Sequence, residues 1–138
     1  MAKAAQPLQV LFVCVENACR SQMAEAFARH HGQGGVLAYS AGSRPRGQID
    51  PETVAVMRER GFDLSRQASK GLSDLPQQTW DAIVTMGCGD ACPHLPAKRR
   101  FDWQVPNPSG SPPAEFRRIR DSIEASVKTL LDDLTQVL

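Results

Sequence analysis

Two residues that can do chemistry together, Cys14 and Arg20, stand six positions apart in the stretch CVENACRS. A cysteine thiolate is a strong nucleophile, and a guanidinium group matches two oxygens of a tetrahedral anion. We therefore expect Cys14 to attack an oxyanion that Arg20 and the intervening loop bind. The loop residues are Val15, Glu16, Asn17, Ala18 and Cys19.

The elements on either side of this loop can position it for anion binding. Residues 8–13 are apolar and often β-branched, which predicts a strand, and residues 21–28 have the apolar spacing of a helix. Unpaired amides and the positive end of the helix dipole attract anions at a helix N-terminus. The same field stabilises a thiolate, so we expect Cys14 to be ionised near neutral pH. Ser21 can donate its hydroxyl to that sulfur, and Asn17 tolerates a left-handed backbone.

Taken alone, a cysteine and an arginine at this spacing also fit a buried residue at a strand end beside a surface arginine. The loop and the following SQMAE, however, resemble the low-molecular-weight tyrosine phosphatase fold and, within it, the arsenate reductases of the thiol-relay type. The resemblance extends from Leu8 over nearly the whole chain. It implies that Cys14 is the nucleophile, Ser21 its stabiliser, and residues 15–20 the binding loop for arsenate.

Length and composition favour a single domain over residues 1–138, with residues 1–6 as a loose tail. The 16 Lys and Arg residues balance 15 Asp and Glu residues, so we expect no nucleic-acid partner. No apolar run approaches the ~20 residues of a membrane span, and residues 1–7 lack the apolar core of a signal peptide. We therefore expect a cytoplasmic monomer without a membrane partner.

Periodicity predicts an α/β domain of three layers, with a four-stranded, mostly parallel sheet and helices on both faces. The predicted strands span residues 8–13, 36–41, 80–86 and 100–105. The predicted helices span residues 21–32 and 51–60 and follow the apolar stripe of residues 116–138. Residues 62–76 should be irregular with one short helical turn. In such a sheet the anion loop lies at the carboxyl ends of the strands.

A second pair of thiols, Cys88 and Cys92, lies in a glycine-flanked loop after the third predicted strand. We expect this loop beside Cys14, where a cysteine pair that closes a disulfide can supply two electrons. The resemblance implies a relay: Cys14 attacks arsenate, Cys88 attacks Cys14 and releases arsenite, and Cys92 attacks Cys88. We expect no bound cofactor or metal and an external dithiol such as thioredoxin, although glutathione or mycothiol with a glutaredoxin-like protein stays open.

The cysteines also fit other roles. A zinc site of Cys14, Cys19, Cys88 and Cys92, with His94 as a further ligand, is disfavoured because structural zinc ligands come in closer pairs. Cys19 can also be an inert buried thiol outside the relay. A passive 88–92 disulfide, a low-molecular-weight tyrosine phosphatase and a non-catalytic, oxyanion-binding thiol switch are the remaining alternatives.

The sequence departs from the family pattern at three places. Asn107-Pro108 replaces the Asp-Pro whose aspartate protonates a phosphatase leaving group, so phosphatase activity should be poor, with Asp102 as a distant substitute. Lys70 stands where some relatives have an aspartate that helps bind potassium with counterparts of Asn17, Glu25 and Ser40. We expect its ammonium to replace the ion. Glu16 replaces a frequent glycine and should face solvent.

Overall fold

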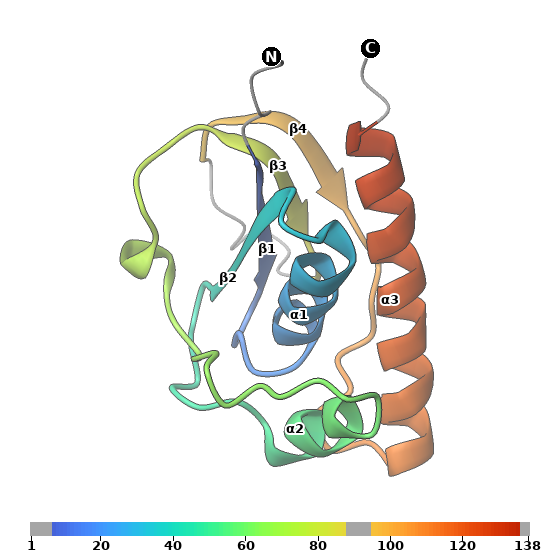
Figure 1. Ribbon diagram of the computed structural model, residues 1–138. Helices are drawn as coiled ribbons and strands as arrows, with labels where there is room; N and C mark the ends of the chain where they lie inside the picture. Colours follow the sequence, from blue (N-terminus) through green and yellow to red (C-terminus); the bar gives the residue numbers. More distant parts are fainter. Residues whose placement is uncertain (1–6, 88–94, 136–138) are drawn as a thin grey trace.

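A computed structural model describes residues 7–87 and 95–135 of the chain and places a four-stranded sheet at its centre (Figure 1). The strands are β1 (Leu8–Cys14), β2 (Val36–Gly42), β3 (Trp80–Thr85) and β4 (Ala97–Asp102). Their order is β2-β1-β3-β4, and each neighbouring pair is parallel. The predicted α/β domain with a four-stranded sheet is confirmed, and the described strands are all parallel.

In the described part of the chain, two α-helices and one 3-10 helix lie between the strands, and a third α-helix follows β4. They are α1 (Arg20–Gly32), α2 (Pro51–Arg58), the 3-10 helix η1 (Leu72–Asp74) and α3 (Pro113–Thr135). Helix α2 begins as predicted, because the Asp50 carboxylate accepts a hydrogen bond of 2.9 Å from the Glu52 amide. It ends two residues before the predicted Arg60. The η1 turn is the short helical turn expected within residues 62–76.

Helices lie on both faces of the sheet, but the described residues cover the two faces unequally. All three α-helices pack into one core with Val10 and Phe12 of β1, on the face that α1 crosses in Figure 1. On the opposite face, Leu11 and Ile83 pack against Leu72, so the described residues cover this face with η1 and irregular chain. The apolar residues after α2 are interrupted by Ser, Asp and Pro, which disfavour a longer helix there.

The fourth strand also differs from its predicted bounds. It starts at Ala97, three residues before the predicted Arg100, and ends at Asp102 instead of Val105. Its pairing is limited by β3, whose last residue, Thr85, lies opposite Asp102. Phe101, Trp103 and Val105, which alternate along the sequence, all pack against the core that contains the three α-helices.

The longest helix, α3, packs against α1 and α2 through the predicted apolar stripe, including Phe116, Ile123 and Val127. Its exposed residues include the charged side chains of Arg117, Arg118, Asp121, Lys128, Asp132 and Asp133. Within residues 7–87 and 95–135, no helix combines the length and the apolar character needed to cross a bilayer.

The register of the sheet brings three strand ends together. Cys14 at the end of β1 lies opposite Gly42 at the end of β2, and the preceding Val13 lies opposite Thr85 at the end of β3. The loops that follow these three strands therefore leave from the same edge, where ligands of open α/β sheets bind.

Candidate active site

The candidate nucleophile is held by a chain of two buried hydrogen bonds. Cys14, which is 2 % exposed, has its Sγ 2.8 Å from the Ser21 Oγ. The Asn17 side-chain amide donates to the same hydroxyl oxygen at 2.7 Å. The Ser21 hydroxyl can therefore accept from Asn17 and at the same time donate its proton to the sulfur, as the sequence predicted.

The orientation of the Asn17 amide is fixed by its other end. Its Oδ1 accepts hydrogen bonds from the Lys70 backbone amide and from Gln22 Nε2, both at 2.9 Å. Gln22 Nε2 also donates to the carbonyl oxygens of Asn17 and Ala68. These contacts hold Asn17 at a φ of 50°, the left-handed conformation that the sequence predicted it could tolerate.

The carbonyl oxygens of the loop are bound from outside. The amide of Arg44 donates to the Val15 oxygen at 2.8 Å, and the amide of Arg46 donates to the Glu16 oxygen at 3.0 Å. The Asp50 amide binds the Ala18 oxygen in the same way. These three bonds hold the loop from one side, and backbone amides of a loop at a helix N-terminus can bind an anion.

Two glycines allow the loop and its arginine to sit where they do. A Cβ at Gly42 would lie 2.5 Å from the Val15 carbonyl oxygen, so β2 can approach the loop only with glycine at this position. A Cβ at Gly87 would overlap the Arg20 guanidinium, and Gly87 also has a φ of 88°. Both positions require glycine for steric reasons.

Arg20 is the first residue of α1 and is 7 % exposed. Its Nη1 donates to the Val105 carbonyl oxygen at 3.1 Å, which fixes the side chain over Gly87. A guanidinium has five N–H donors, so most of them stay available for an oxyanion. The loop after β4, which contains Val105, therefore helps to orient the predicted anion-binding arginine.

A small pocket lies at this point. It is lined by Cys14, Glu16, Ala18, Cys19, Arg20 and Asn107. The predicted nucleophile, the predicted arginine and the residue in the place of the phosphatase acid thus meet at one pocket. The suggested substitute, Asp102, does not line it: Asp102 Oδ1 accepts a hydrogen bond of 2.9 Å from Thr85 Oγ1.

Cys19 also lines the pocket. It is 4 % exposed, and burial is the main cause that raises the pKa of its thiol to about 11. Cys19 is therefore a neutral thiol near neutral pH and a poor nucleophile.

Sequence reasoning missed Arg46 as a residue at the site. Its Nη2 lies 2.6 Å from Glu16 Oε1 in the anion loop. Glu16 was expected to face solvent; its side chain is 45 % exposed, and Glu16 also lines the pocket. The sequence indicated only that residues 42–49 form a loop with arginines, because no periodicity links Arg46 to a residue thirty positions earlier.

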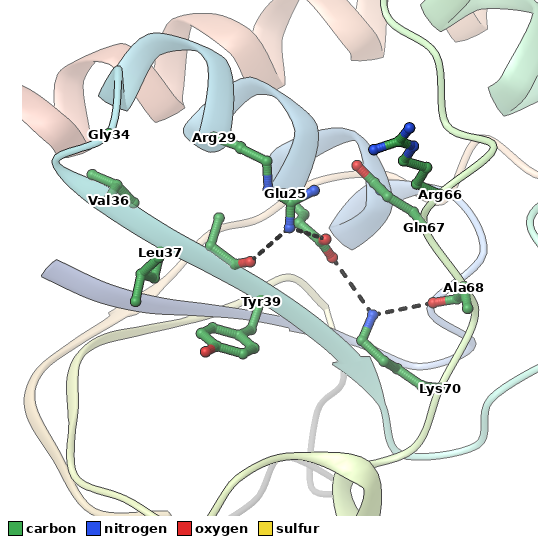
Figure 2. Close-up of a pocket in the computed structure, with 11 residues that line it drawn as sticks. Glu25, Arg29, Gly34, Val36, Leu37, Tyr39, Arg66, Gln67, Ala68 and Lys70 are labelled. Carbon is green, nitrogen blue, oxygen red and sulfur yellow. Dashed lines mark hydrogen bonds and ion pairs between the residues drawn. The ribbon is translucent and has the colours of Figure 1, made fainter. Parts of the chain in front are cut away.

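Beside the loop, Lys70 approaches a buried carboxylate (Figure 2). Its Nζ lies 3.6 Å from Glu25 Oε1 and donates to the Ala68 carbonyl oxygen at 3.1 Å. The Ser40 hydroxyl also donates to Glu25, and Arg29 binds the second carboxylate oxygen at 2.7 Å. The ammonium of Lys70 thus lies near Glu25 and Ser40, two of the residues that the family resemblance related to a potassium site.

Both relay cysteines, Cys88 and Cys92, lie outside the described residues, as does His94 of the zinc alternative. The structure describes the chain up to Gly87, which directly precedes Cys88. β3 pairs with β1, and Gly87 lies against Arg20. The segment with the second thiol pair therefore begins beside the anion loop.

The parallel sheet with a cysteine and an arginine at the two ends of an anion loop defines a class of enzymes with a nucleophilic cysteine that act on oxyanions. The chain belongs to the family described as low molecular weight phosphotyrosine protein phosphatase, which residues 9–137 match. The resemblance inferred from the loop and the SQMAE motif is confirmed.

Similar proteins within this family include arsenate reductases. An arsenate reductase of Staphylococcus aureus (strain bovine RF122 / ET3-1) is 36 % identical over 123 residues, which are 86 % of this chain and 92 % of that protein. A glutaredoxin arsenate reductase of Synechocystis sp. (strain ATCC 27184 / PCC 6803 / Kazusa) is 34 % identical over 126 residues, 89 % of this chain and 95 % of that protein.

Solved structures give the same result. One described as an arsenate reductase in the phosphate binding state is 31 % identical, with a TM-score of 0.83 over 92 % of this chain and 98 % of that one. The thioredoxin-dependent arsenate reductase of Corynebacterium glutamicum is 34 % identical, with a TM-score of 0.79 over 96 % of this chain and 64 % of that one.

Proposed function

We propose that this protein reduces arsenate to arsenite through the nucleophile Cys14 and a disulfide relay with Cys88 and Cys92. The observation that carries the proposal is the hydrogen bond of 2.8 Å between Cys14 and Ser21 inside an anion loop closed by Arg20. Cys88 directly follows Gly87, which lies against Arg20, and Cys92 comes later in the same segment. These two thiols can supply the two electrons that arsenate reduction needs and phosphate hydrolysis does not.

The chemistry runs in three thiol steps. The Cys14 thiolate attacks the arsenic of bound arsenate, a sulfur–arsenic bond forms, and a protonated oxygen leaves as water. The Cys88 thiolate then attacks the Cys14 sulfur; the sulfur–arsenic bond breaks, and its electron pair stays on arsenic, which leaves as arsenite. Finally the Cys92 thiolate attacks Cys88, so the disulfide moves to the 88–92 pair and Cys14 is a thiolate again.

The groups around Cys14 have separate tasks in the first step. Arg20 and the backbone amides of residues 15–20 bind the oxygens of the anion. Ser21 holds the sulfur as a thiolate until it attacks. Neutral Cys19 does not compete, because burial raises its pKa to about 11.

An external dithiol must reduce the 88–92 disulfide after each cycle, and the protein binds no cofactor of its own for this step. We assign this role to a protein of the thioredoxin type, which the Corynebacterium glutamicum relative supports. The Synechocystis relative supports glutaredoxin as the other donor. We propose that the protein is cytoplasmic. We also propose that it is a monomer, since Leu37 is the single large apolar side chain exposed in the described part of the chain.

A tyrosine phosphatase is the second candidate function, because the family as a whole bears that description. Asn107 lines the pocket where a phosphatase needs an acid, and an amide cannot protonate a leaving group. Loss of general acid catalysis costs about 10²–10⁴ in rate. A thiol switch without turnover is the third candidate.

A single-turnover experiment separates the three functions. The fully reduced protein is mixed with excess arsenate and no reductant, and arsenite and free thiols are counted. The proposed function predicts one arsenite for each protein molecule and the loss of two thiols, from Cys88 and Cys92. Continued hydrolysis of an aryl phosphate without thiol loss would indicate a phosphatase, and neither product would indicate a switch.

A further inference from the structure

Arg46 joins three segments around the pocket. Its Nη2 lies 2.6 Å from Glu16 Oε1 in the anion loop, and its Nη1 lies 3.1 Å from Asp50 Oδ2 at the start of α2. Nη2 also donates to Ser109 Oγ at 3.2 Å, two residues after Asn107. The side chain is 28 % exposed, so these contacts hold it at the surface beside the pocket.

The position of Glu16 creates a problem that Arg46 solves. Glu16 lines the same small pocket as Cys14 and Arg20, so its side chain starts at the rim of the predicted oxyanion site. Like charges a few ångströms apart repel, and an arsenate or phosphate dianion doubles the effect. An unpaired carboxylate at this rim would oppose the binding that Arg20 favours.

The charges around Arg46 agree with a fixed ion pair. The hydrogen bond to Glu16 is the largest cause that raises the pKa of the Arg46 guanidinium above its usual range. Partial burial of Asp50 opposes its ionisation, but hydrogen bonds from Arg46 and the Glu52 amide outweigh this and lower its pKa. Arg46 thus carries one positive charge between two ionised carboxylates.

We propose that Arg46 is a positioning residue for oxyanion binding, which neutralises the Glu16 carboxylate at the rim of the pocket and turns it away from the bound anion. The inference deepens the proposed function and rests on the anion loop that this function uses. It does not require that the bound anion be reduced. Arg46 itself acts through Glu16 and the loop and does not touch the anion.

The test measures phosphate affinity without turnover. Inorganic phosphate protects Cys14 from alkylation by iodoacetamide, and its concentration dependence gives a dissociation constant. We expect Arg46→Gln to weaken phosphate by about threefold to tenfold. Arg46→Lys, which keeps the charge, should stay within about twofold of wild type.

Removal of Glu16 distinguishes charge from architecture. In Arg46→Gln/Glu16→Gln no carboxylate is left to oppose phosphate, so most of the lost affinity should return. The effect of Arg46→Gln should also shrink between about 0.01 M and 1 M salt, because the Debye length falls from about 30 Å to 3 Å. A role of Arg46 that is only structural would give neither result. Arg117→Gln removes an arginine that pairs with Glu59 and does not line the pocket, and it serves as the control for net charge.

Three results would overturn the proposal. They are an unchanged affinity in Arg46→Gln, no recovery in the double variant, and an effect that does not depend on salt. If Arg46→Gln does not fold, Glu16→Gln alone decides: the loss of one negative charge beside Arg46 should strengthen phosphate by about threefold to tenfold, and an unchanged affinity contradicts the proposal. Absent arsenate turnover with intact phosphate protection would reject the reductase function and leave the role of Arg46 standing.

Discussion

The hydroxyl oxygen of Ser21 lies 2.8 Å from the sulfur of Cys14 and accepts a hydrogen bond of 2.7 Å from Asn17, so its own proton is free to bind the sulfur. Both Cys14 and Ser21 are buried. Their contact links the start of α1 directly to the end of β1.

Replacement of Ser21 by alanine should slow the reaction without unfolding the protein. A hydrogen bond to a charged group contributes about 1.5–3 kcal/mol, so the rate of arsenate reduction should fall about 10- to 100-fold in Ser21→Ala. Alkylation of Cys14 by iodoacetamide at neutral pH should slow as well. Ser122→Ala is the control, since Ser122 donates only to the Ile119 carbonyl oxygen of α3. Equal rates for Ser21→Ala and wild type would refute the role of Ser21.

Restoring the missing acid should strengthen phosphatase chemistry. Asn107 lines the pocket with Cys14 and Arg20, so Asn107→Asp places a carboxyl group beside the leaving oxygen. We expect hydrolysis of an aryl phosphate to rise by about 10²-fold, with an acidic limb in its pH profile. Asp102→Asn should leave the weak hydrolysis of the wild type unchanged, because Asp102 binds Thr85. A loss of hydrolysis in Asp102→Asn would instead identify Asp102 as the acid.

Turnover should not depend on potassium, because the ammonium of Lys70 already lies 3.6 Å from the Glu25 carboxylate. We expect equal rates in potassium chloride and sodium chloride at matched ionic strength. In Lys70→Ala the buried Glu25 keeps Arg29 but loses one cation, so stability should fall by about 1 kcal/mol. Urea unfolding in both salts measures this change. Stimulation of the wild type by potassium would show that Lys70 does not replace the ion.

Acid should remove a stabilising contact between α3 and the residue that follows α2. Hydrogen bonds from Arg117 and then Arg120 lower the pKa of the Glu59 carboxyl to about 2, from an ordinary value near 4.5. The folded state therefore binds this proton less readily than the unfolded state. The contribution of Glu59 is complete above about pH 4.5 and is lost as the pH falls toward 2.

Unfolding of wild type and Glu59→Gln at a series of pH values checks this. The difference in unfolding free energy should be constant above about pH 5 and should narrow below it. A difference that grew with falling pH would have the wrong sign for a lowered pKa.

Sequence patterns could predict the parts of the site that depend on local chain order. The strand, loop and helix around residues 8–28 are contiguous, so their apolar spacing was enough to place Cys14, Arg20 and Ser21 together. The start of α2 at Pro51 could be predicted for the same reason, because Asp50 caps a helix that begins at the next residue. The partners of β1 in the sheet followed from general rules of α/β topology.

The rest depends on contacts between distant residues, which leave no periodic signal. Nothing in the spacing connects Glu16 to Arg46, or Arg20 to the Val105 carbonyl and to Gly87. The details of the second sheet face left no signal for a related reason: Leu72 of η1 packs there, partly buried, within irregular chain that has no regular apolar stripe.

The central claim is a relay through three cysteines, and one coupled assay tests it most directly. NADPH consumption is followed with arsenate, thioredoxin and thioredoxin reductase for wild type, Cys14→Ser, Cys88→Ser and Cys92→Ser, with aryl phosphate hydrolysis measured in parallel. We predict arsenate-dependent turnover by wild type and its loss in each of the three variants. Turnover that persisted in Cys88→Ser or Cys92→Ser, or hydrolysis without any arsenate reduction that needed only Cys14, would contradict the relay.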